Sequence, residues 1–94
     1  APFVPVLTVA PDGEPHMIVC GRVAAVDDAN DTLTFRAIVM RQTRANLASN
    51  PYMQVVLAVR GATPRESRGF RLTGRGAVEG DLVRFRIDRT EPLV

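Results

Sequence analysis

The chain has 94 residues, of which 46% are hydrophobic and 23% charged, and its formal net charge is +2. These values indicate one domain over residues 1–94, and no apolar run approaches the roughly 20 residues of a transmembrane helix. So small a net charge gives no reason to expect a nucleic-acid partner. The single cysteine excludes an internal disulfide and a cysteine-based metal cage. Without a secretory signal pattern, a cytoplasmic protein without a membrane partner is expected.

The first third of the chain predicts a β-hairpin. Residues 3–10 (FVPVLTVA) are apolar and β-branched, and Pro5 restricts this strand to a sheet edge or to the beginning of the strand. Residues 11–14 (PDGE) favour a turn, because Pro presets φ and Gly accepts a positive φ. Residues 16–26 (HMIVCGRVAAV) predict the second strand.

A third strand follows a turn at residues 27–31 (DDAND). Residues 32–40 alternate in polarity, as expected for a strand with one buried face. The residues expected on one face are Leu33, Phe35, Ala37 and Val39, and those expected on the other are Thr32, Thr34, Arg36 and Ile38.

Helix-forming residues cluster only in the stretch VMRQTRANLASNP, residues 39–51. Thr43 is the expected N-cap, and Pro51 ends the helix because it disfavours helical geometry at Asn50. The basic segment RQTR, residues 41–44, precedes free helix N–H groups that can hold a phosphate. A capped, solvated helix start accounts for the same residues equally well.

The rest of the chain predicts three more strands. Residues 52–60 (YMQVVLAVR) are apolar on both faces, whereas residues 69–78 and 82–89 alternate apolar residues with Arg and Thr. Six strands with one short helix after the third predict a mainly β, small antiparallel barrel, whose closure removes exposed strand edges.

Three other features carry little functional signal. The glycines of residues 74–80 (GRGAVEG) lie within a strand pattern with no helix after them, so bulges or close backbone approaches are expected there. His16 has no acid or nucleophile near it in the sequence and is expected at the surface. Cys20 lies among apolar residues and is expected to act as a small buried hydrophobe.

The order of these motifs resembles the FMN-binding split β-barrel family, the pyridoxamine 5′-phosphate oxidase-like proteins. The segment LTVAPDGEPH (residues 7–16) is similar to the family's first hairpin. The segment DTLTFRAIVMRQTRANLASNPYMQVVLAV (residues 31–59) is similar to its central strand–helix–strand block, with the pattern T-x-x-N-L-x-x-N-P. The segment RGFRLTGRGAV (residues 68–78) is similar to its glycine-containing strand.

The resemblance implies FMN at the interface of a homodimer. For the phosphate it implies Arg36, Arg41, Gln42 and Thr43, with Asn46 supporting the helix; many family members carry Lys where Gln42 stands. For the flavin ring it implies mostly backbone contacts along two strands. The residues of those strands are Val19, Cys20 and Gly21, and Ala37, Ile38 and Val39.

By this resemblance the protein is a flavoprotein, working as an FMN-dependent oxidoreductase or in electron transfer, with a small-molecule redox substrate or an electron partner. A deazaflavin-dependent reductase on the same fold is one alternative. A cofactor-free β-barrel binding module is another. Family chains are commonly longer, so this chain is either a minimal version or lacks segments.

Overall fold

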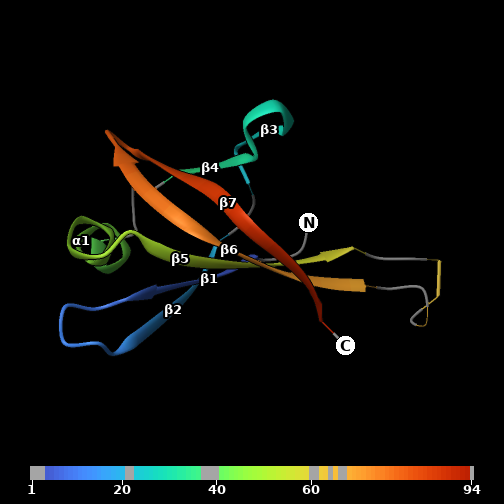
Figure 1. The fold of residues 1–94 in the computed structure, drawn as a ribbon, viewed down its shortest axis with the longest axis horizontal. Coiled ribbons are helices and arrows are strands. Elements are labelled where there is room, and N and C mark those ends of the chain that lie inside the picture. The colour runs from blue at the N-terminus through green and yellow to red at the C-terminus, as the bar shows by residue number, and fades with distance from the viewer. Residues whose placement is uncertain are drawn as a thin grey trace.

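The computed structural model describes residues 4–20, 23–36, 41–59, 62–63, 65 and 68–93. Within them a single antiparallel sheet has the strand order β2-β1-β5-β6-β7-β4-β3, and one α-helix lies against it (Figure 1). The strands are β1 Val4–Val9, β2 Pro15–Cys20, β3 Ala25–Asp27, β4 Thr32–Arg36, β5 Tyr52–Val59, β6 Arg68–Glu79 and β7 Leu82–Leu93; the helix is α1, Arg41–Ser49.

The expected mainly β, antiparallel architecture with one helix is confirmed, but the strand count and the closed barrel are not. The expected strand over residues 16–26 is two strands in different places: β2 pairs with β1, and β3 pairs with β4 at the other end of the sheet. The helix therefore follows the fourth strand. In the described part of the chain no ladder joins β2 to β3, so the sheet remains open.

One face of the sheet, here called the inner face, carries the hydrophobic core. Leu33 and Phe35 are buried on β4 as their alternation predicts, and Val83 and Phe85 face them from β7. The buried hydrophobic residues are Val4, Val6, Leu33, Phe35, Leu47, Met53, Val55, Leu72, Val83 and Phe85. Removing these side chains from water is the main stabilising term for the sheet.

Glycines allow two close backbone approaches in β6, as expected for this segment. The register between β6 and β7 shifts between Thr73 and Gly74, and a Cβ on Gly74 would lie 1.9 Å from the backbone oxygen of Arg86. A Cβ on Gly76 would lie 2.6 Å from the sulfur of Met53. Gly74 thus permits a β-bulge, and Gly76 leaves room for the core beneath α1.

The opposite face, here called the outer face, is apolar along β2 and β1. Met17 is 61% exposed and Val19 58% exposed, and Leu7 lies half-buried beside them. β5 was expected to be buried on both faces, but its outer residues Gln54 and Val56 are only half-buried. An apolar outer face on this scale is typical of a surface that meets another molecule.

No helix in the described part of the chain is long and apolar enough to cross a bilayer.

Candidate functional site

Three elements meet at the beginning of α1. β4 ends at Arg36, whose register partner is Leu82 at the start of β7. Arg44, in the first turn of α1, donates a hydrogen bond from its guanidinium to the carbonyl oxygen of Gly80 at 3.1 Å. The end of β4 and the first turn of α1 therefore lie on either side of the tight turn between β6 and β7, which also carries Asp81.

A chain of hydrogen bonds fixes α1 on the inner face. Asn46 is fully buried and donates from Nδ2 to the hydroxyl of Thr8 on β1 at 3.0 Å. Its Oδ1 accepts a hydrogen bond from Nε2 of Gln42 at 2.7 Å. The expected supporting role of Asn46 thus has a structural basis, because its amide joins the first turn of the helix to the sheet.

Thr43 lies inside the first turn of α1 and is not the N-cap, because the helix begins two residues earlier, at Arg41. Its side chain is 1% exposed, and its hydroxyl has no hydrogen-bond partner among the described residues. A buried hydroxyl without a partner carries a free-energy cost that a ligand oxygen can relieve.

The donors at this helix start suit a phosphate. The backbone N–H groups of the first helical turn have no partner within the helix, and they lie at the positive end of its dipole. Arg41 and Gln42 are exposed, and Arg36 is exposed at the end of β4. Of the four residues that the resemblance implies for a phosphate, Arg36, Arg41 and Gln42 are exposed at the end of β4 and the start of α1, whereas Thr43 is buried.

Of the residues implied for the flavin ring, the structure describes Val19 and Cys20. β2, with Val19 and Cys20, lies at one edge of the sheet, and β1, β5, β6 and β7 separate it from β4. Val19 faces outward and is exposed, whereas Cys20 packs against the core. Gly21, Ala37, Ile38 and Val39 lie outside the described residues.

Cys20 and His16 occupy the positions expected of ordinary strand residues. Burial raises the pKa of the Cys20 thiol, so the neutral form is favoured at neutral pH. His16 is half-buried on β2 opposite Thr8. In the part of the chain that the structure describes, no group of three His, Cys, Asp or Glu side chains could hold a metal ion.

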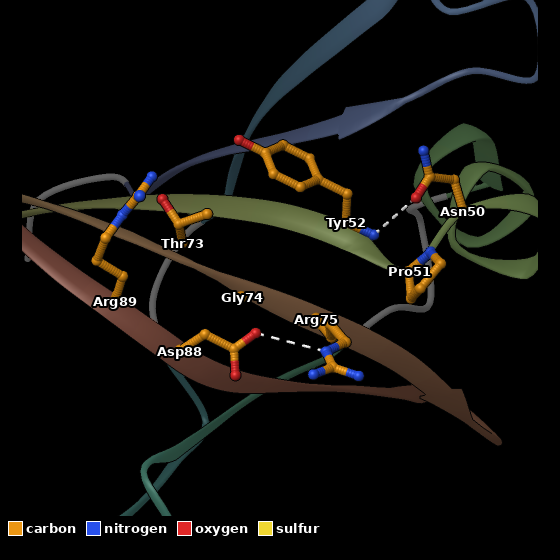
Figure 2. Close-up of a pocket in the computed structure, with 8 residues that line it drawn as sticks. All are labelled: Asn50, Pro51, Tyr52, Thr73, Gly74, Arg75, Asp88 and Arg89. Atoms are coloured by element: carbon orange, nitrogen blue, oxygen red, sulfur yellow. Dashed lines mark hydrogen bonds and ion pairs between the residues drawn. The ribbon is translucent and has the colours of Figure 1, made fainter.

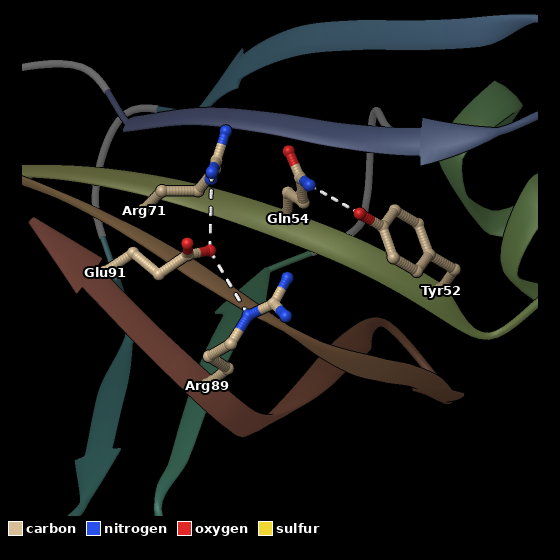
Figure 3. Close-up of polar contacts among 5 residues, drawn as sticks. All are labelled: Tyr52, Gln54, Arg71, Arg89 and Glu91. Atoms are coloured by element: carbon tan, nitrogen blue, oxygen red, sulfur yellow. Dashed lines mark hydrogen bonds and ion pairs between the residues drawn. The ribbon is translucent and has the colours of Figure 1, made fainter. Parts of the chain in front are cut away.

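A polar cluster on the outer face of β5, β6 and β7 did not figure in the sequence predictions. One carboxylate oxygen of Glu91 accepts a hydrogen bond from Arg71, at 3.3 Å, and forms an ion pair with Arg89, at 3.2 Å (Figure 3). Beside them the amide of Gln54 donates to the hydroxyl of Tyr52. The alternation of Arg with apolar residues in β6 and β7 indicated that these arginines lie on one face of the sheet. It did not indicate which residues on neighbouring strands they pair with.

Comparisons with known proteins relate the chain to others by structure alone. No family model and no curated protein matches the sequence. HupZ from Group A Streptococcus superposes with a TM-score of 0.78 at 18% identity, over 97% of this chain and 84% of that one. An FMN-binding protein from Syntrophomonas wolfei superposes with a TM-score of 0.76 at 16% identity, over 97% and 76%. HutZ from Vibrio cholerae, described as a heme storage protein, gives 0.58 at 12% identity, over 98% and 82%.

At these identities the likeness shows a shared fold, the split β-barrel, and nothing about a common ligand. Proteins of this fold include one described as binding FMN and others described as binding or storing heme. The fold thus accommodates cofactors of two chemical classes. Which of them this chain binds depends on its own residues.

Proposed function

We propose that this chain is an FMN-binding flavoprotein of the split-barrel type that holds the flavin phosphate at the beginning of α1. The observation that carries the proposal is the buried hydroxyl of Thr43, which has no hydrogen-bond partner among the residues that the structure describes, in a helical turn flanked by Arg41 and Arg36. Arg36, Arg41 and the first-turn N–H groups supply charge and directed donors to the phosphate. Gln42 supplies no charge and is held by Asn46, so the arginines take the place of the Lys that related proteins carry.

The flavin, when bound, supplies hydride or electron transfer, while the protein provides binding and orientation. For this chain that means an oxidoreductase with a small-molecule substrate, or an electron carrier with a redox partner. The fixed attachment of α1 through Asn46 and Thr8 keeps the phosphate donors in one arrangement before the ligand arrives. Such preorganisation reduces the entropy cost of binding.

The proposed assembly is a homodimer built on the apolar outer face of β2 and β1. Met17 and Val19 would otherwise leave a large apolar surface in water, which a second copy can cover. A dimer also accounts for the separation of β2 and β4 in one sheet, since the flavin ring can contact β4 of one chain and β2 of the other. The backbone near Val19 and Cys20 is then within the proposed site.

The phosphate-binding donors at the beginning of α1 favour FMN, which carries a phosphate, over heme as the ligand. Heme needs an axial ligand from the protein, commonly His, and His16 is the only histidine of the chain. It is half-buried on β2 with Thr8 of β1 as its register partner, so it lies on the inner face and not on the outer face proposed for the dimer. A deazaflavin would use the same barrel, and a direct competition against FMN tests that alternative.

The sharpest test compares FMN with riboflavin, which lacks the phosphate. We expect FMN to bind more tightly, as judged by quenching of flavin fluorescence. Arg41→Ala combined with Thr43→Val should weaken FMN binding by about 2–4 kcal/mol and leave riboflavin binding unchanged. Arg68→Gln, an equal loss of charge at an exposed position at the start of β6, is the matched control and should leave both affinities unchanged.

Thr43→Val alone gives a second readout, because the hydroxyl that it removes has no partner in the described part of the chain. The variant should melt at an equal or higher temperature without ligand, yet bind FMN more weakly. Equal binding of FMN and riboflavin by the unaltered protein would refute the phosphate site. So would an unchanged preference for FMN in the double variant.

A further inference from the structure

A pocket opens on the outer face at the end of α1, opposite to the helix end proposed for the flavin phosphate (Figure 2). Its volume is about 390 Å³, within the roughly 300–1,000 Å³ of small-molecule sites. The residues that line it are Asn50, Pro51, Tyr52, Thr73, Gly74, Arg75, Asp88 and Arg89. They come from the α1–β5 link, the start of β5, β6 and β7.

The β-bulge at Gly74 shapes the pocket. Across β6 and β7, Thr73 pairs with Arg89 and Gly74 pairs with Ile87, so Asp88 is an extra residue in β7. Such a bulge redirects neighbouring side chains, and here it places Asp88 and Arg89, consecutive in sequence, at the same pocket. The lack of room for a Cβ on Gly74 keeps this arrangement fixed.

The opposite wall is apolar and held by backbone hydrogen bonds. The backbone N–H of Tyr52 donates to Oδ1 of Asn50 at 3.0 Å, and the backbone N–H of Gly76 donates to the carbonyl of Pro51 at 2.8 Å. Figure 2 shows Pro51 and the Tyr52 ring on one side of the pocket, facing Arg75, Asp88 and Arg89 on the other. An aromatic ring and a proline offer a flat, preformed contact surface.

Around the pocket, arginine side chains outnumber the carboxylates that pair with them. Arg75 is paired with Asp88, with 3.4 Å between Nε and Oδ2. Arg71 and Arg89, by contrast, share one oxygen of Glu91, so one positive charge remains without a carboxylate of its own (Figure 3). The hydroxyl of Thr73, a residue only 9% exposed, also has no partner among the described residues, and neither has Nε of Arg71.

We propose that this pocket binds a small planar carboxylate. The terminal nitrogens of Arg89 hold the carboxylate, since only Nε of that guanidinium is engaged by Glu91, and a guanidinium matches a carboxylate in bidentate geometry. The planar body of the ligand lies against Tyr52 and Pro51. The site does not require FMN, because the nine residues of α1, about 13 Å of helix, separate it from the proposed phosphate site.

Benzoate is the test ligand, and benzamide, of the same shape without charge, is its control. Titration followed by NMR should shift the backbone amides of Gly74 and Arg89 and the ring resonances of Tyr52. Tyr52 is the only tyrosine in the sequence, so its ring signals need no assignment by elimination. Benzamide should produce shifts at least about fivefold weaker at the same concentration.

Two variants locate the binding groups. Arg89→Gln should weaken benzoate binding by about fivefold or more, whereas Arg84→Gln, an equal charge loss on the same strand outside the pocket, should not. Tyr52→Leu should weaken benzoate but leave the fold intact, because that side chain is 36% exposed. The proposal fails if benzamide binds as tightly as benzoate, or if Arg89→Gln and Arg84→Gln behave alike. It also fails if inorganic phosphate binds this pocket as tightly as benzoate does, since the planar body would then contribute nothing.

Discussion

Replacing Asn46 by Ala removes the centre of the hydrogen-bonded chain that joins α1 to β1. Asn46 and Thr8 are both fully buried, and 3.0 Å separates Nδ2 from the hydroxyl oxygen. The variant leaves the hydroxyl of Thr8 without this donor, at a cost of about 1–3 kcal/mol. The small cavity adds about 1 kcal/mol. Gln42 is exposed and returns to water at little cost, so we expect a total loss of about 2–4 kcal/mol.

Urea unfolding and thermal melting measure this loss. For a domain of this size each kcal/mol lowers Tm by about 4–8 °C, so Asn46→Ala should melt at least about 8 °C lower. A double-mutant cycle with Thr8→Val isolates the contact, because the double variant has neither partner. Its total cost should fall short of the sum of the single costs by about 1 kcal/mol or more. Strict additivity, or a loss below about 0.5 kcal/mol for Asn46→Ala, would refute the assigned role.

Three further outcomes are expected. Gly74→Ala should destabilise by more than about 3 kcal/mol, seen as a collapse of Tm, because its Cβ would clash with the backbone oxygen of Arg86. Burial raises the pKa of the Cys20 thiol, so the contribution of this thiol to the free energy of unfolding should be constant below the thiol's unfolded pKa and fall as pH rises above it. Cys20→Val should lose this decline in urea titrations. Met17→Glu with Val19→Glu, both on the exposed outer face, should convert the proposed dimer to a monomer in sedimentation velocity, whereas a dimer that persists would place the interface elsewhere.

Local patterns in the sequence predicted much of the fold. The alternation of Leu33 and Phe35, the Gly13 turn and the stop before Pro51 each depend on residues a few positions apart, and each is found in the structure. Gly13 has a φ of +89°, as the turn required. Close backbone approach at Gly74 was also expected, because a glycine inside a strand pattern commonly marks a bulge or a neighbouring backbone that leaves no room for a side chain.

Long-range pairing explains what the sequence could not predict. Residues 16–26 read as one strand because both halves are apolar, yet Cys20 ends β2 and Ala25 begins β3 at the other edge of the sheet. Nothing local distinguishes that division from one continuous strand. Thr43 was expected to cap the helix because Thr is a common N-cap, but tertiary packing buried it within the first turn.

The burial of Thr43 could not be predicted from the sequence, but the position of Arg36, Arg41 and Gln42 around one strand–helix junction was predictable, because these residues lie close in sequence. The pocket between α1 and β7 was not, since it depends on a bulge that brings Asp88 beside Arg75. Cross-strand partners of this kind follow from register, and register is settled by the whole sheet.

The strand order also has a consequence for how the chain folds. β5, β6 and β7 pair in sequence order, whereas β4 pairs with β7 and β1 with β5 across about fifty residues of chain. We expect the three-stranded meander to form first and the two N-terminal hairpins to dock later on its opposite edges. During synthesis the β3–β4 hairpin must wait for the last strand, β7, to leave the ribosome before it has a neighbour. Until then the apolar side chains of β4 remain uncovered, which makes chaperone contact or aggregation a matter of timing rather than of final stability.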